Sequence, residues 1–276
     1  MPYVKVGQEN SGSIQLYYED HGEGRPVVLI HGYPLSSRAW DKQLPVLLED
    51  GHRVITYDRR GFGKSSQPTM GYEYDTFASD LNALMEALDL RDVTLVGHSM
   101  GTGEVTRYLS KYGSARVARG VLISPIPPFL LQTDDNPEGV PGSLFDGFVQ
   151  QARDDGPAWM KGFLDTFYNF DKLRGTRVSD QAYQASWNIA VSAGATATVA
   201  CIPTWETDFR ADLPRIDVPM LMIQGDADNV LPYPKTGQRL AGMIRDLQSV
   251  VIEGGPHAIS WTHADQVNSA LLKFMA

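Results

Sequence analysis

The chain has 276 residues, enough for one large domain or two small ones around a sizeable core. Apolar residues make up 42% and charged residues 21% of the sequence, as in an ordinary globular protein and unlike a disordered one. Its 24 basic and 33 acidic residues leave a net charge of −9, which argues against a nucleic-acid binder, and its single cysteine, Cys201, excludes an internal disulfide and a cysteine-based zinc cluster.

The sequence shows no sign of a membrane or export segment. Its longest apolar strings, such as residues 27–30, are far too short to span a bilayer. The first ten residues, MPYVKVGQEN, lack the hydrophobic region of a secretory signal. We therefore expect a cytoplasmic protein that has neither a membrane nor a nucleic acid as its partner.

The first part of the chain alternates short β-rich runs with helix-like stretches. Strands are predicted at residues 13–20 and 26–30, and a helix over residues 37–48, where apolar residues recur at helical spacing. Further strands are expected at residues 53–57, 93–96 and 121–124, and further helices at residues 75–88 and 100–112. This alternation of apolar strands with helices predicts an α/β fold, in which a parallel sheet is covered by helices on both faces.

The alternation stops near residue 125. Residues 127–215 are first rich in Pro and Gly and then predominantly helical, with many aromatic side chains and no convincing strand. Strands resume at residues 218–224 and near residue 249, and a last helix runs from about residue 262 to the end. We interpret residues 1–126 and 216–276 as one core that is interrupted by a helical cap, residues 127–215.

The motif GHSMG, residues 97–101, falls where a predicted strand gives way to a helix. A G-x-S-x-G sequence at such a junction forms a nucleophile elbow. Gly97 and Gly101 leave room for a sharp turn, which lifts the Ser99 hydroxyl above the sheet edge and places it at a helix N-terminus. We predict that Ser99 is a nucleophile, and a structural serine on a glycine-rich turn is the alternative.

A serine hydroxyl needs a base, and that base needs a carboxylate to orient it. His257 follows the strand near residue 249 across the loop EGGPH, at the sheet edge where open α/β proteins build their sites. The segment QGDADNVLP places two carboxylates after another strand. We expect Asp226 to bond within its own turn and Asp228 to reach His257, which gives the chain order Ser–Asp–His.

An oxyanion needs backbone N–H donors beside the nucleophile. One is expected from Met100, which follows Ser99, and the other from Tyr33 in HGYPL, directly after the strand at residues 26–30. Gly32 lets the backbone approach closely, and Pro34 restricts the conformation of Tyr33. An ordinary strand-exit turn is the alternative.

The remaining polar motifs are assigned to structure. The loop YDRRGFGKSS lacks the spacing of a phosphate-binding P-loop, so Asp58, Arg59 and Arg60 are interpreted as a network that braces the site loops. We assign His98 to packing, and three other histidines to exposed positions: His21 and His52 in surface turns and His263 in a solvated or capping position. No metal-binding pattern is present, and we expect no cofactor.

In this order, HGYP, DRRGFGKSS, GHSMG, GDAD and GGPH resemble the α/β-hydrolase superfamily over essentially the whole chain. The runs YYEDHGEGRPVVLIHGYPLSSRAW, TDDNPEGVPGSLFDG and SWNIA resemble the cofactor-free haloperoxidase branch, with its perhydrolases and aryl esterases, and most of all its bacterial γ-lactamases. The resemblance implies a mostly parallel eight-stranded sheet, a triad of Ser99, Asp228 and His257, oxyanion donors at Tyr33 and Met100, and a homo-oligomer, either a dimer or a trimer. Serine at the elbow argues against the dehalogenase and epoxide-hydrolase branches, which need a carboxylate there.

These features predict a serine hydrolase that acts on small esters, lactams or amides through an acyl-enzyme and can pass the acyl group to hydrogen peroxide. The aromatic cap predicts a small hydrophobic substrate, and the candidates to contact it are Phe129, Phe163, Trp187 and Trp205. The alternatives are a non-catalytic receptor for a small ligand and a lyase that uses the same triad.

Overall fold

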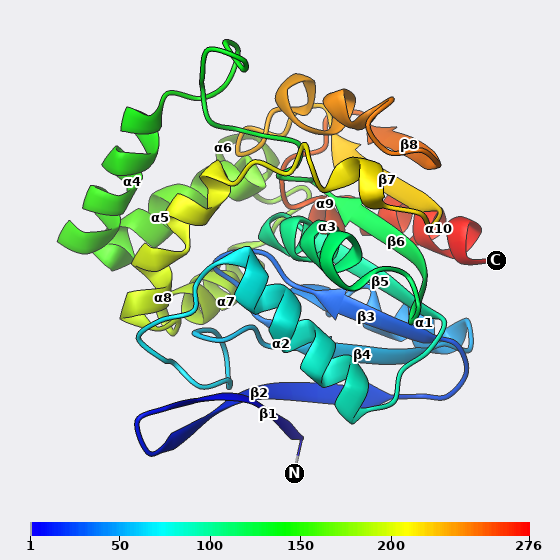
Figure 1. Cartoon of the computed structure of the whole chain (residues 1–276). Helices are drawn as coiled ribbons and strands as arrows, with labels where there is room; N and C mark the ends of the chain where they lie inside the picture. The colour runs from blue at the N-terminus through cyan, green and yellow to red at the C-terminus, as the bar shows by residue number, and fades with distance from the viewer. Residues whose placement is uncertain (1) are drawn as a thin grey trace.

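An eight-stranded sheet forms the middle of the molecule, with helices on both of its faces (Figure 1). The computed structural model describes residues 2–276. The strands are β1 (Tyr3–Glu9), β2 (Gly12–His21), β3 (Pro26–Ile30), β4 (Arg53–Tyr57), β5 (Val93–His98), β6 (Val117–Ile123), β7 (Met220–Gly225) and β8 (Leu247–Ile252). They lie in the order β1-β2-β4-β3-β5-β6-β7-β8, with β1 and β2 antiparallel and all neighbours from β4 to β8 parallel. The predicted α/β class is confirmed.

Strand β3 shows why its sequence is continuously apolar. Val28 packs on one face with α2 (Tyr74–Ala87) and α3 (Met100–Tyr112), whereas Val27 packs on the other face with α1 (Leu44–Glu49) and α10 (Ala264–Met275). Successive side chains of a strand point to opposite faces, and here both faces are covered.

The structure differs from the predicted elements at two places near the N-terminus. Residues 37–48, predicted as one helix, form a 3-10 helix, η1 (Ser37–Trp40), and the separate helix α1, because Pro45 is accepted in the first turn of a helix and not in its interior. Strand β1 was not predicted, because it lies at the sheet edge and buries only Val4, so its sequence lacks a clear apolar alternation.

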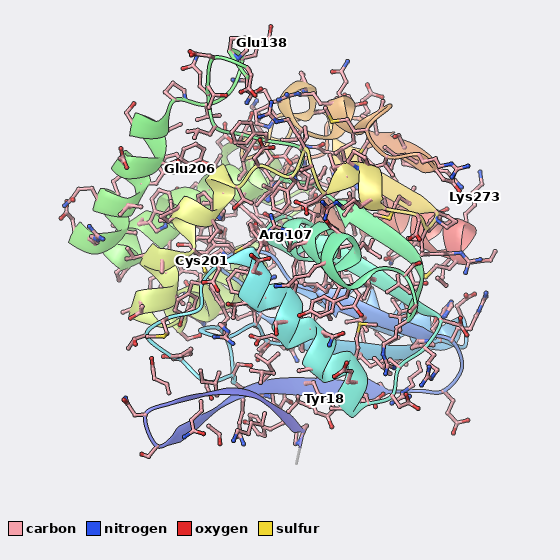
Figure 2. The ribbon with its side chains drawn as sticks, in the orientation of Figure 1. Tyr18, Arg107, Glu138, Cys201, Glu206 and Lys273 are labelled. Carbon is pink, nitrogen blue, oxygen red and sulfur yellow. The ribbon has the colours of Figure 1, made fainter. Side chains whose placement is uncertain are left out.

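Helices fill the chain between β6 and β7. They are α4 (Gly142–Asp154), α5 (Gly156–Tyr168), α6 (Phe170–Leu173), α7 (Asp180–Val191), α8 (Ala195–Ala200), η2 (Ile202–Glu206) and η3 (Leu213–Arg215). Figure 1 shows α4, α5, α7 and α8 as one group beside the core. Hydrogen bonds join this group to the loops that follow β3, β7 and β8, so it lies over the carboxyl ends of these strands. The largest apolar cluster is formed there, and it contains Cys201, labelled in Figure 2.

The other short elements are η4 (Tyr233–Lys235), η5 (Gly237–Leu240) and α9 (Ile259–Thr262). Among residues 2–276, no one helix has the length and apolarity to cross a membrane, and only α7 with Ala195–Glu206, a pair bent by 99°, passes by length and composition. The same part of the chain has no group of three His, Cys, Asp or Glu side chains arranged to hold a metal ion.

Candidate active site

Ser99 occupies the sharp turn between β5 and α3. Its backbone has φ 54° and ψ −121°, a strained conformation for a residue that has a side chain. The turn requires glycine at both positions that flank Ser99. A Cβ on Gly97 would collide with the Gly101 carbonyl, and a Cβ on Gly101 would collide with the Ile30 carbonyl. The strained turn therefore presents Ser99 at the N-terminus of α3, where it lines a cavity of 690 Å³, called the larger cavity below.

A buried pair of side chains lies beyond the ends of β7 and β8. His257 Nδ1 and Asp228 Oδ2 are 2.8 Å apart, and both side chains are fully shielded from solvent. The backbone N–H groups of Val230 and Leu231 donate to the other carboxylate oxygen, at 3.0 and 2.8 Å. Because the carboxylate accepts, Nδ1 carries the proton of the neutral ring and Nε2 has a lone pair. His257 Nε2 is buried and has no hydrogen-bond partner within residues 2–276.

The main chain of His257 is also held in place. His98 Nε2 and Ser124 Oγ both donate to its carbonyl oxygen, at 3.0 and 3.1 Å. Burial, with a further contribution from His257, lowers the pKa of His98 to about 3, so its ring is neutral at physiological pH. His98 therefore does more than the packing that the sequence analysis assigned to it: it ties the residue before the nucleophile to the loop that carries His257.

Two expectations for other polar residues were wrong. Asp226 does not bond within its own turn, because its Oδ1 accepts from the N–H of Gly254, at 2.7 Å, in the loop that leads to His257. His52, which was expected in a surface turn, is buried, whereas His263, which was expected in a solvated or capping position, is buried at the N-cap position of α10. For Asp226 and His52 the partner comes from a loop whose position the sequence alone does not give: the Arg25 carbonyl faces His52 and the loop after β8 faces Asp226.

The two predicted oxyanion donors belong to residues close to Ser99, one next to it in the chain and one in the loop after β3. Met100 begins α3, and the loop that carries Tyr33 passes directly over the nucleophile, since a Cβ on Gly32 would lie 2.8 Å from the Cβ of Ser99. Within residues 2–276, neither the Tyr33 nor the Met100 backbone N–H has an acceptor. These free donors are what a developing negative charge beside Ser99 requires.

The Tyr33 side chain anchors the same loop to the helices above it. Its hydroxyl donates to the Thr198 carbonyl and accepts from Trp159 Nε1, each at 3.0 Å. Burial raises the pKa of Tyr33 above its usual range, so the phenol remains protonated. The loop is thereby fixed from the sheet side by β3 and from the opposite side by α5 and α8.

The larger cavity has a volume of 690 Å³ and reaches Ser99 and Tyr33. Of the four candidate substrate contacts, Phe163 and Trp205 line it. Phe129 and Trp187 are not among its lining residues: Phe129 lies under the Arg210 guanidinium, and Trp187 packs against the apolar cluster of the helical segment. The sequence analysis missed the other apolar lining residues, which include Ile126, Leu130, Phe145, Phe148 and Trp159. Their helical spacing fits core packing equally well, so it carries no signal that separates the two roles.

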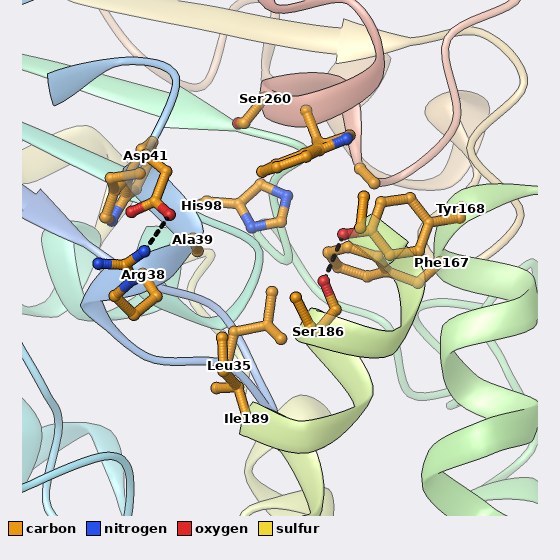
Figure 3. A pocket seen from close by; sticks show the side chains of 15 residues that line it. Leu35, Arg38, Ala39, Asp41, His98, Phe167, Tyr168, Ser186, Ile189 and Ser260 are labelled. Atoms are coloured by element: carbon orange, nitrogen blue, oxygen red, sulfur yellow. Dashed lines mark hydrogen bonds and ion pairs between the residues drawn. The ribbon is translucent and has the colours of Figure 1, made fainter. Parts of the chain in front are cut away.

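A smaller cavity of 110 Å³ lies behind His98, between η1, α7 and α9 (Figure 3). The Arg38–Asp41 and Tyr168–Ser186 contacts cross its walls. Ser99 is not among its lining residues, so the larger cavity is the one that can bring a substrate to the nucleophile.

The chain is similar to known proteins over most of its length. Residues 25–264 match the family model described as the alpha/beta hydrolase fold. A Synechocystis sp. protein provisionally named a non-heme chloroperoxidase is 61% identical over 275 residues, 100% of both chains. A bifunctional esterase/perhydrolase of Acinetobacter calcoaceticus is 35% identical over 95% of this chain and 96% of its own. The crystal structure of a bromoperoxidase from Bacillus anthracis covers 99% of this chain and 98% of its own, with a TM-score of 0.95 and 45% sequence identity. The chain therefore belongs to the α/β-hydrolase family, in its branch of non-heme haloperoxidases.

Proposed function

We propose that the protein is a serine hydrolase that moves the acyl group of a small hydrophobic ester, amide or lactam onto Ser99, and from there to water or hydrogen peroxide. The observation that carries this proposal is the state of His257. Asp228 fixes its proton on Nδ1, which leaves a buried Nε2 with a lone pair and no partner within residues 2–276. A nitrogen in that state is a base ready for a hydroxyl proton.

The first half of the reaction loads the serine. His257 Nε2 takes the proton of Ser99 Oγ as this oxygen attacks the carbonyl carbon, and Asp228 stabilises the imidazolium that forms. The Tyr33 and Met100 N–H groups hold the resulting oxyanion, and each such donor contributes about 3 kcal/mol to the transition state. The imidazolium then gives its proton to the departing alcohol or amine, and the acyl-enzyme remains.

The second half depends on the acceptor. Water, which loses a proton to His257, releases the carboxylic acid. Hydrogen peroxide attacks in the same way and releases a peroxy acid, which passes one oxygen atom to a halide ion in solution to give hypohalite and the carboxylic acid. This route accounts for the haloperoxidase and the esterase/perhydrolase names among the relatives with one acyl-enzyme.

The cavity supports a neutral, apolar acyl group. Its inner wall is built from aromatic and aliphatic side chains, whereas Asp154, Asp155 and Lys235 contribute charged groups to its lining. Apolar cavities with few polar groups bind neutral organic ligands.

The test compares Ser99→Ala with Ser114→Ala, a control beyond the C-terminal end of α3. Each is assayed on p-nitrophenyl acetate, on a bicyclic γ-lactam, and for bromination in acetate with hydrogen peroxide. We expect Ser99→Ala to lose at least about a thousandfold of every activity that the unmodified protein shows, while Ser114→Ala loses none, since triad removal has effects of this size. Bromination that survives in Ser99→Ala contradicts a shared acyl-enzyme. A fluorophosphonate probe that fails to label Ser99 favours the receptor.

A further inference from the structure

A buried ion pair joins α3, which begins at Met100, to the loop after β4, and this loop in turn is bonded to His31 at the start of the Tyr33 loop. Arg59 follows β4, and Glu104 lies one turn after Met100 in α3. Arg59 Nε donates to Glu104 Oε2 at 2.8 Å and Nη2 lies 2.7 Å from the same oxygen, while the Tyr57 hydroxyl donates to the other carboxylate oxygen. The two charged side chains are 1% and 0% exposed.

Arg59 also fixes the state of His31, the last residue before the loop of Gly32 and Tyr33. Its backbone N–H donates to His31 Nε2 at 3.0 Å, and its Nη2 donates to the His31 carbonyl oxygen at 2.9 Å. Because a backbone N–H is only a donor, Nε2 must accept, and the ring proton is on Nδ1. Burial and the Arg59 charge hold the pKa of His31 well below its usual range, so the neutral ring keeps this one tautomer.

The proton on His31 Nδ1 has a defined use. It is donated to the carbonyl oxygen of Gly32 at 2.8 Å. That carbonyl and the N–H of Tyr33 belong to one planar trans peptide group, in which the two bonds point in opposite directions. Holding the Gly32 oxygen therefore sets the direction in which the Tyr33 N–H points.

We propose that Arg59 and Glu104 are positioning residues for acyl transfer, and this proposal rests on the proposed function above. The ion pair fixes the strand-exit loop through His31 and fixes α3 through Glu104, so that the Tyr33 and Met100 N–H groups converge on one oxyanion. A buried ion pair is weak evidence for stability, because apolar residues of the same volume are often as stabilising. The need to hold both oxyanion donors in place explains why Arg59 and Glu104, rather than apolar residues, occupy these buried positions.

The chain contains a matched control one residue away. Arg60 forms a second buried pair with Asp80 on α2, through contacts of 2.6 and 2.7 Å, and these side chains are 5% and 4% exposed. This pair joins the same loop to a neighbouring helix but contacts neither His31 nor α3. Arg59→Lys and Arg60→Lys therefore make the same chemical change in two buried ion pairs, and only the first disturbs the proposed positioning.

The experiment measures three quantities for each variant: the acylation rate constant from the burst of p-nitrophenolate, the KM for the ester, and the affinity for an alkyl boronic acid, which forms a tetrahedral adduct on serine. We expect Arg59→Lys to slow acylation by about 10- to 100-fold, because a misdirected oxyanion donor should cost no more than a donor that is removed. Boronic acid binding should weaken by a similar factor. Its KM stays within about twofold, because binding of the ester does not use the oxyanion donors and because deacylation uses the same donors as acylation, so that the ratio of the two rate constants is kept. Arg60→Lys lowers the melting temperature and leaves all three quantities unchanged.

Two further variants keep the test decisive if Arg59→Lys does not fold. His31→Asn retains an N–H donor near the position of Nδ1, whereas His31→Phe fills the space without one, so we expect faster acylation in the former at matched melting temperatures. Equal losses of acylation in the Arg59 and Arg60 variants overturn the proposal, and so does boronic acid affinity that is unchanged when acylation slows. Failure of the proposed function is distinguishable, because the unmodified protein would then show no burst and no labelling of Ser99.

Discussion

The buried His98 ring makes the stability of the fold depend on pH. Its pKa is lowered from 6.5 to about 3, so below pH 6.5 the unfolded chain takes up a proton that the folded chain does not. The contribution of His98 to the free energy of unfolding is therefore fully present above pH 6.5 and is lost as the pH falls toward 3. The variant His98→Gln keeps a donor for the His257 carbonyl but has no group that titrates at this position. When the pH is lowered from 7.5 to 5.5, the free energy of unfolding of the unmodified protein should fall by about 1 kcal/mol more than that of His98→Gln.

Urea unfolding at the two pH values measures this difference, and His21→Gln, at the surface, is the control. Equal pH dependence in His98→Gln and the unmodified protein would show that His98 takes up its proton in the folded state.

His98 also shows which contacts a short sequence motif does not predict. GHSMG identifies Ser99 because its spacing encodes a local turn, whereas the bond from His98 to His257 joins residues 159 positions apart.

At the scale of single elements, helix α5 forms part of the wall of the larger cavity. Gly162 lies in the interior of this helix and lines the cavity, and a Cβ placed on it meets no atom within 4 Å. Gly147 has the same free space in α4 but does not line the cavity. Replacing either glycine by leucine should stabilise its helix by up to about 1 kcal/mol, since glycine is a poor helix former.

Only Gly162→Leu should change specificity. We expect kcat/KM for p-nitrophenyl octanoate to fall by about 10-fold or more relative to that for the acetate, because the new side chain takes space from a long acyl group. The ratio of the two kcat/KM values gives the result directly. A ratio that shifts equally in Gly147→Leu would mean that the acyl chain does not lie along α5.

Elements were predictable from the sequence where burial on both faces made their pattern plain. Strand β3 is a continuous apolar run, β4 and β5 are largely apolar and buried, and all three were predicted with nearly their observed bounds. Strand β1 and the break between η1 and α1 were not, because edge pairing and a proline-started helix depend on neighbours more than on periodicity. The lining of the cavity depends in the same way on how α4 and α5 pack together.

For the whole molecule, the helices between β6 and β7 share one apolar cluster with the site loops. This cluster contains Cys201 and Phe163 from that segment together with Tyr33, Met100 and Ala258 from the core. Because the apolar contacts are continuous, we expect the helical segment to unfold only when the core does. The predicted order of strands and helices could not reveal this coupling, which depends on contacts that are distant in sequence.

Cys201 offers a measurement of that coupling, since it is the one cysteine of the chain. It is fully buried, and burial raises the pKa of its thiol to about 12, so the folded protein should react with a disulfide reagent at pH 8 at least about a thousandfold more slowly than the unfolded chain. If opening is global, the logarithm of the labelling rate rises with urea at the slope of the complete unfolding transition. A clearly smaller slope would show that the helical segment opens by itself, and Cys201→Ser, which cannot be labelled, gives the background rate.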